Sequence, residues 1–127
     1  MKKCESVEKL QTVLIVDDDK VQHMINRKLL SRACPDLEIH CFASPLEALD
    51  WLADQSADLL LLDINMPEMK VWEFLEILDE KGIRVEVKML SSSMDEGDFE
   101  RSKNYPQVSG FLLKPLNKTA VEELLNS

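Results

Sequence analysis

The sequence is poor in the residues that mark disulfide frameworks, metal sites and flexible linkers. Only three of its 127 residues are cysteines, Cys4, Cys34 and Cys41. An odd number of widely spaced cysteines, without a C-x-x-C pair or a Cys/His spacing, favours isolated thiols in a reducing compartment over a metal or redox site. No stretch rich in Pro, Gly or Ser divides the chain. The sequence therefore gives no sign of a linker between two domains.

Basic residues are fewer than acidic ones: 15 Lys and Arg stand against 24 Asp and Glu, a formal net charge of −9. Nucleic acids and anionic membrane surfaces attract proteins with a basic patch, so this balance argues against both as partners. The apolar runs are too short to span a bilayer, and the first 11 residues lack the apolar core of a signal peptide. We therefore expect a cytoplasmic protein.

A length of 127 residues suits one domain with a true hydrophobic core. We expect residues 1–11 to form an N-terminal extension and residues 12–127 to form the domain. Within it, segments of strand type alternate with segments of helix type. The expected strands span 13–16, 37–43, 59–63, 85–90 and 108–113, and the expected helices begin after residues 19, 44, 70, 93 and 117.

Regular alternation of strands and helices with short loops predicts an α/β fold, in which helices cover both faces of a parallel sheet. For five such units, the doubly wound, flavodoxin-like strand order 2-1-3-4-5 is the natural arrangement, so we expect a (βα)5 fold. One feature fits poorly, because Arg84, Glu86 and Lys88 alternate through a strand that this order places inside the sheet. We expect the long Lys88 side chain to reach the end of the strand or to extend outward to solvent.

Apolar spacing predicts the buried faces of the helices. For the first helix the spaced residues are Val21, Met24, Ile25 and Leu29. For the second, which begins with a capping box at Ser44, they are Leu46, Leu49, Leu52 and Ala53. For the third, which Gly82 is placed to end, they are Val71, Phe74, Leu75 and Leu78. For the last, which Asn117 can cap, they are Val121, Leu124 and Leu125.

Polar residues gather where the expected strands end, which is where doubly wound sheets bind their ligands. They are carboxylates after the first and third strands, serines after the fourth and a lysine after the fifth: Asp17, Asp18, Asp19, Asp63, Ser91, Ser92, Ser93 and Lys114. The fold would therefore bring carboxylates, a hydroxyl and one ammonium group to a single edge of the sheet.

This combination suits phosphoryl transfer assisted by magnesium. Clustered carboxylates repel one another, and a hard divalent cation with oxygen ligands relieves that repulsion. Mg²⁺ is favoured because it needs few protein ligands and keeps several waters. A carboxylate beside the cation can attack phosphorus and form an aspartyl phosphate. Lys114 and a serine hydroxyl can bind the phosphoryl oxygens.

Four motifs at successive strand ends resemble the receiver domain of two-component response regulators. They are LIVDDD at 14–19, LLLDINMP at 60–67, MLS at 89–91 and GFLLKP at 110–115. Each motif alone is weakly specific, but all four occur in the family's order, and the resemblance runs from about residue 12 to residue 125.

The resemblance implies a role for each acidic residue of the motifs. Asp63 matches the aspartate that accepts the phosphoryl group. Asp18 matches the acidic residue that binds Mg²⁺ directly, and Asp17 matches its neighbour, which usually acts through a water. Asn65 matches the position whose backbone carbonyl completes the cation site, to which Asp63 also contributes.

The resemblance also implies how the phosphoryl group is bound and sensed. Ser91 matches the Thr or Ser whose hydroxyl meets the phosphoryl group, and Lys114 matches the lysine that pairs with its oxygens. The Lys114–Pro115 bond looks like the family's cis peptide. Phe111 occupies the aromatic switch position on the fifth strand.

Three departures from the family pattern bear on function. Lys70-Val71 stands where many members have Asp-Gly, and loss of that glycine restricts the loop after the phosphoacceptor. Phe111 has no hydroxyl, unlike the tyrosine of other members. Because three serines run together, a one-residue slip would make Ser92 rather than Ser91 the hydroxyl that faces the phosphate.

We therefore expect a stand-alone, single-domain response regulator, phosphorylated on Asp63 by a histidine kinase or a histidine phosphotransfer protein and acting through a downstream target protein. It would be a monomer or weak dimer, and not an enzyme beyond its own phosphoryl transfer and dephosphorylation.

Three alternatives remain open. The first is a constitutive interaction module with the receiver fold, which Lys70-Val71 keeps possible. The second is a Mg²⁺-dependent phosphatase, but such enzymes commonly need a second aspartate where this chain has Asn65. The third is a flavodoxin, but no Ser/Thr/Gly-rich phosphate loop follows the first strand.

Overall fold

The computed structural model describes residues 11–64, 68–91, 96–113 and 116–126, with side chains up to Glu122 in the last stretch. The strands are β1 (Thr12–Val16), β2 (Glu38–Phe42), β3 (Leu59–Asp63), β4 (Glu86–Ser91) and β5 (Val108–Leu113). The helices are α1 (Lys20–Ala33), α2 (Pro45–Asp54), α3 (Val71–Glu80), α4 (Glu96–Ser102) and α5 (Lys118–Asn126). No helix in these stretches is both long and apolar enough to cross a membrane.

The strands form one parallel sheet in the order β2-β1-β3-β4-β5, which confirms the predicted doubly wound fold. β3 is buried along its whole length because helices cover both of its faces, which explains its uninterrupted leucine run. β2 lies at one edge, as its alternating polar pattern predicts.

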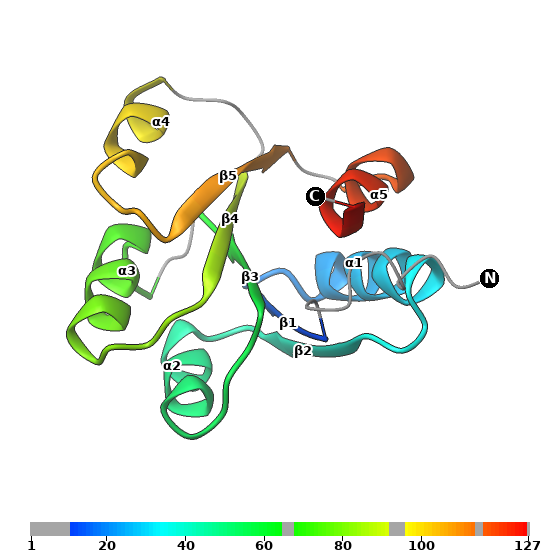
Figure 1. Ribbon diagram of the computed structural model, residues 1–127, viewed down its shortest axis with the longest axis horizontal. Coiled ribbons are helices and arrows are strands. Elements are labelled where there is room, and N and C mark those ends of the chain that lie inside the picture. Colours follow the sequence, from blue (N-terminus) through cyan, green and yellow to red (C-terminus); the bar gives the residue numbers. More distant parts are fainter. Residues whose placement is uncertain (1–10, 65–67, 92–95, 114–115, 127) are drawn as a thin grey trace.

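The helices form two layers, one on each face of the sheet (Figure 1). α1 and α5 lie on one face, over a core that includes Val13, Ile15 and Leu61. α2, α3 and α4 lie on the other, where α2 and α3 cover Leu14, Leu60 and other side chains of the same strands. Alternate residues of each strand thus supply the two cores, since successive side chains point to opposite faces.

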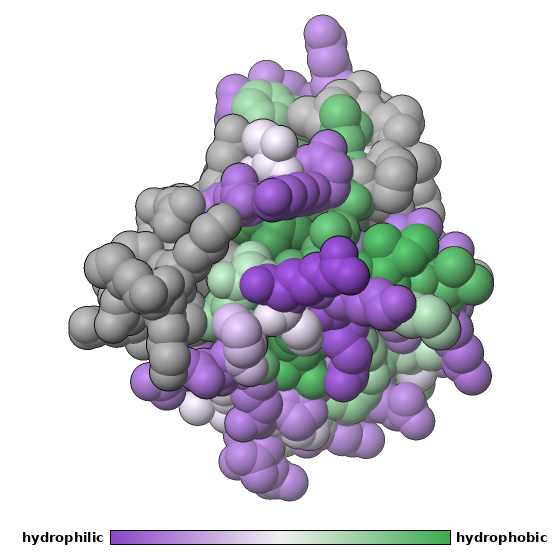
Figure 2. Space-filling view, turned by 90° about the vertical axis from the view of Figure 1, so that its right-hand side faces the viewer, coloured by the Kyte–Doolittle hydropathy of each residue, from purple (hydrophilic) through white to green (hydrophobic). Residues whose placement is uncertain are grey.

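The predicted buried face of α1 is wrong at three of its four positions, and its fourth residue, Leu29, is half-buried against the core. Val21 and Met24 are 64% and 62% exposed and Ile25 is also exposed, whereas Asn26 and Leu30 are buried. Helical spacing identifies an apolar stripe but does not show whether that stripe faces the core. In α1, which packs against α5, the side that carries Asn26 and Leu30 faces the core instead. Figure 2 views the side that carries α1 and α5, and hydrophobic surface lies there among hydrophilic residues.

The prediction for α2 is wrong at two of its four positions. Leu46 is 54% exposed and Ala53 is exposed, while Pro45 and Ala48 take their places in the core beside Leu49 and Leu52. The Ser44 side chain makes no capping hydrogen bond and instead donates to Glu68 Oε2 at 3.4 Å. The second helix therefore begins where predicted, without the predicted cap.

Lys88 extends along the sheet surface as expected, from a strand inside the sheet. Its Nζ lies 3.8 Å from Glu86 Oε2, and its side chain keeps 18% of its surface exposed. On β5, Gly110 lies beneath it, and a Cβ at that position would come within 3.4 Å of Nζ. A methyl group at this position would lie in ordinary van der Waals contact with the Lys88 side chain.

The ends of α3 and α5 are also as predicted. The predicted core residues of α3 are all buried. Gly82 follows α3 with φ of 69°, and Ile83 N–H donates to Leu78 O at 2.9 Å in a Schellman-type ending. At the start of α5, Ala120 N–H donates to Asn117 Oδ1 at 2.8 Å, and Val121 is buried. Leu124 and Leu125 lie beyond the described side chains.

We predict that Gly82→Ala lowers the free energy of unfolding by about 1 kcal/mol, because alanine is strained at positive φ. A Cβ at Gly82 meets nothing within 4 Å, so the loss would come from backbone strain alone. Urea unfolding measures it, and Gly82→Asn is the matched control, since asparagine tolerates this conformation. Equal midpoints for wild type and Gly82→Ala would contradict the prediction.

Candidate functional site

The candidate site lies at the carboxyl edge of the sheet, where β1, β3 and β4 end side by side. Asp17 follows the last residue of β1, Asp63 is the last residue of β3, and Ser91 is the last residue of β4. The parallel register pairs Val16 with Leu62 and Asp63 with Leu90, so the three strands end at the same level. Strand order and register thus bring together residues that the sequence places 46 and 28 positions apart.

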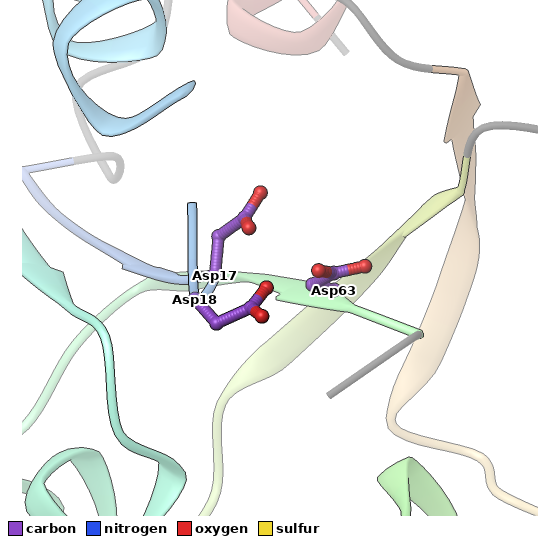
Figure 3. A group of neighbouring side chains, drawn as sticks. All are labelled: Asp17, Asp18 and Asp63. Atoms are coloured by element: carbon purple, nitrogen blue, oxygen red, sulfur yellow. The ribbon is translucent and has the colours of Figure 1, made fainter. Parts of the chain in front are cut away.

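Asp17, Asp18 and Asp63 form one carboxylate cluster (Figure 3). Each offers an oxygen that lies within 4.8 Å of the others. Asp17 and Asp63 are only 0% and 2% exposed, whereas Asp18 is open to solvent. Buried carboxylates at this separation repel one another strongly unless positive charge lies between them.

Backbone hydrogen bonds position these side chains. Asp17 N–H donates to Phe42 O at 3.1 Å, which ties the end of β1 to β2. Asp17 Oδ1 accepts from Asp19 N–H at 2.9 Å, which turns the chain toward α1. Beyond Asp63, Ile64 N–H donates to Leu90 O at 3.0 Å and continues the ladder with β4. The two buried carboxylates are thus set by the sheet itself.

The third aspartate of the DDD run has a different task. Asp19 is the N-cap of α1, and its Oδ1 accepts from Val21 N–H at 2.9 Å and from Gln22 N–H at 3.4 Å. Because Asp19 caps the helix, Asp17 and Asp18 are not used for that purpose. The sequence alone could not divide capping from clustering among three adjacent aspartates.

The donor set of the cluster fits a hard divalent cation. All of its ligand atoms are carboxylate oxygens, and one face is open through Asp18 to water, which suits Mg²⁺ with its retained waters. The N-terminal end of α1 also lies beside the cluster and places backbone N–H dipoles near it. The three aspartates are therefore the described residues that could hold such an ion.

Ser91 lies on β4, the neighbour of β3, and Phe111 lies on β5, the strand beyond β4. Ser91 is buried, and it pairs with Leu113 in the ladder between β4 and β5. Phe111 is half-buried on β5, and its ring packs at 5.9 Å from that of Phe99 on α4. Sequence reasoning missed Phe99, although an aromatic residue in a largely polar helix was a usable signal.

Other residues of the predicted site lie outside the described residues. These are Asn65, Ser92, Lys114 and Pro115. Along the chain, Asn65 follows Asp63 by two positions, and Lys114 directly follows the last residue of β5. β3 and β5, the strands that precede Asn65 and Lys114 in the sequence, both end at the carboxyl edge of the sheet.

Comparison with protein families identifies the chain. The model of the response regulator receiver domain matches residues 13–126. The transcriptional regulatory protein DcuR of Escherichia coli (strain K12) is 31% identical over 116 residues, which cover 89% of this chain and 48% of that protein. The cyclic di-GMP phosphodiesterase response regulator RpfG of Xanthomonas campestris is 39% identical over 62 residues, 49% of this chain and 16% of that protein. The chain thus spans about half or less of these curated relatives.

Solved structures agree with this assignment. A two-component response regulator from Legionella pneumophila has a TM-score of 0.80 at 27% identity, covering 90% of this chain and 94% of its own. A CheY-like receiver domain protein from Methanospirillum hungatei shares the fold, with a TM-score of 0.79 at 24% identity and coverage of 91% and 90%. With its predicted strand order and its aspartates clustered at the carboxyl edge, the chain belongs to the response regulator receiver domain family of two-component signalling.

Proposed function

We propose that this receiver domain is a Mg²⁺-dependent phosphorylation switch whose phosphoacceptor is Asp63. The observation that carries the proposal is the cluster of Asp17, Asp18 and Asp63, with oxygens within 4.8 Å of one another at the end of β3. A Mg²⁺-dependent phosphatase would use similar carboxylates but commonly needs a second aspartate where this chain has Asn65. Here the described groups are carboxylates and one buried serine.

The transfer itself is simple in bonding terms. A carboxylate oxygen of Asp63 attacks the phosphorus of a phosphohistidine on the donor protein, and the P–N bond breaks. The bonding electrons go to the imidazole nitrogen, and Asp63 becomes an acyl phosphate. The donor would be a histidine kinase or a histidine phosphotransfer protein. Such a step depends on alignment and charge neutralisation more than on acid–base chemistry.

The remaining residues would neutralise and bind the transferred group. Asp17, Asp18, Asp63 and the Asn65 carbonyl would hold Mg²⁺, which when bound withdraws charge from the phosphoryl oxygens. Lys114 would pair with those oxygens, and the Ser91 hydroxyl would donate a hydrogen bond to one of them. Ser91 is buried beside Asp63 on the neighbouring strand, which supports this role.

Signalling would follow from a shift between two conformations. A phosphoryl group drawn toward Ser91 would alter β4, and Phe111 on β5 would respond through its contact with Phe99 on α4. A downstream protein would read the altered surface of α4, β5 and α5. The named activities of DcuR and RpfG differ, so the output of this chain is not carried over from either, and its stand-alone arrangement stays a prediction.

A constitutive interaction module is the second candidate. Lys70 is the N-cap of α3 and makes no side-chain capping bond, and Val71 is buried, so the loop after Asp63 enters the helix without the usual glycine. A stiff loop would favour one fixed conformation. The two candidates differ in whether Asp63 accepts phosphate.

We expect acetyl phosphate with Mg²⁺ to add one phosphoryl group to wild type and none to Asp63→Ala, as read by intact-mass spectrometry. Asp19→Asn is the matched control, because it removes a neighbouring charge but keeps a good N-cap. It should be labelled like wild type. Equal labelling of wild type and Asp63→Ala would remove Asp63 from its role, and no labelling of either would favour the constitutive module.

Mg²⁺ should also raise the free energy of unfolding, because it binds the folded cluster and not the unfolded chain. Without Mg²⁺, Asp18→Asn should be more stable than wild type by about 0.5 kcal/mol, since one like charge is removed. With excess Mg²⁺, wild type should gain more stability than the variant. Thermal unfolding at several Mg²⁺ concentrations measures this, with Asp19→Asn again as control, and an equal gain for Asp18→Asn would speak against the cation site.

A further inference from the structure

α4 has the fewest buried side chains of the described helices with complete side-chain data. It spans seven residues, Glu96–Ser102, and its only buried residue is a serine, Ser102. Phe99, its large apolar residue, is 46% exposed. α4 therefore lacks the buried apolar stripe that fixes α2 and α3, and its position must rest on contacts at its surface.

Two ring contacts tie α4 to neighbouring elements. Phe99 packs against Phe111 of β5, with ring centroids 5.9 Å apart. Arg101 places its guanidinium 4.9 Å from the ring centre of Trp72, which is the second residue of α3. Figure 1 shows α3 and α4 next to each other on the same side of the sheet. A guanidinium over an indole face is attractive because the ring carries negative charge above its plane.

Trp72 is itself fixed by a small polar-aromatic cluster. Its ring stacks on Tyr105, with centroids 5.4 Å apart and planes at 25°. Tyr105 Oη donates to Glu76 Oε2 at 3.0 Å, one turn along α3 from Trp72. Burial first, and Glu76 second, raise the pKa of Tyr105 above its ordinary value, although the neighbouring Arg101 guanidinium offsets part of this rise, so the hydroxyl keeps its proton at neutral pH and remains a donor. We name Trp72, Glu76, Arg101 and Tyr105 the Trp72 cluster.

Trp72, at the centre of this cluster, lies near the start of α3, the helix that follows Asp63 along the chain. Trp72 follows Asp63 by nine positions, and α3 begins at Val71 immediately after the intervening loop. Both residues at the start of α3 are buried, so this end of the helix is firmly packed. Arg101 therefore connects an exposed, lightly held helix to a rigid point next to the loop from Asp63.

We propose that Arg101 is the positioning residue of α4: its contact with Trp72 fixes the resting position of the helix, and loss of this contact accompanies phosphorylation. The second half of this inference rests on the proposed function of Asp63. The contact is weak enough to be reversible, because an exposed cation–π pair changes an equilibrium by only a few-fold to about tenfold. The contact between Arg101 and Trp72 would affect α4 from the side of α3, in addition to the effect of Ser91 and Phe111 on the same helix.

Arg101→Gln tests the resting position by hydrogen–deuterium exchange in the unphosphorylated full chain. We expect the amides of α4 to exchange about fivefold faster, with α2 and α3 unchanged. Lys103→Gln is the matched control: Lys103 lies 5.1 Å from the Phe99 ring and pairs with Glu100, so its contacts stay within or next to α4. Arg101→Lys, which keeps the charge but loses the planar group, should fall between wild type and Arg101→Gln. Unchanged α4 exchange in Arg101→Gln would overturn the proposal.

The link to phosphorylation is tested with Mg²⁺ and beryllofluoride on the same variants. In wild type this phosphoryl mimic should speed α4 exchange and shift the emission of Trp72, read in a Trp51→Phe background. In Arg101→Gln, where the contact is already lost, both changes should shrink at least twofold, while acetyl phosphate still labels Asp63. If acetyl phosphate does not label wild type, both the proposed function and the link to phosphorylation are wrong. The hydrogen–deuterium exchange of the unphosphorylated variants still tests whether Arg101 positions α4. If labelling is normal and Arg101→Gln responds fully, the link alone is wrong.

Discussion

The crowding of two buried carboxylates at the ends of adjacent strands is the constraint on which the rest of the structure depends. Asp17 and Asp63 have almost no exposed surface, and the register of β1 and β3 sets the distance between the strand ends from which their side chains extend. Burial of like charges costs stability. The apolar strands beneath supply the compensating free energy, since the leucines of β3 are buried by helices on both faces. The buried core beneath the site therefore helps to hold the two carboxylates together, beside the hydrogen bonds that position Asp17.

α1 complements this crowding in its charge and in its orientation. It starts directly beside the carboxylates, so the positive end of its dipole faces them, and its first turn contains no acidic residue. Throughout residues 20–33 there is no Asp or Glu, in a chain of net charge −9. Asp19 satisfies the first amides of the helix, which leaves its neighbours available to the cluster. One helix end thus offsets part of the repulsion that the strands impose.

The alternation of strands and helices could be predicted from short local patterns, whereas the strand order followed from the usual arrangement of doubly wound sheets and the membership of the carboxylate cluster from the resemblance to receiver domains. Buried parallel strands are apolar runs, and parallel strands bring their carboxyl ends together. The buried face of α1 could not be predicted, because Val21, Met24 and Ile25 satisfy helical spacing as well as the residues that the core actually takes. The tie between Arg101 and Trp72 was hidden for a different reason: it joins residues 29 positions apart across two helices, and no periodicity reports such a contact.

The unequal burial of the helices decides which part of the domain can respond to a signal. A bound group shifts a conformational equilibrium only by its difference in affinity for the two states, typically a few kcal/mol. Displacing α3 would expose several buried apolar side chains, Phe74 and Leu75 among them, at about 2 kcal/mol each, and together these costs exceed that free energy. α4, with one buried serine and two ring contacts, can be moved within that limit. A switch built on this fold therefore acts through α4, the helix with the fewest buried side chains among those described in full. The contacts that position α4 set the free-energy difference that a bound group must overcome.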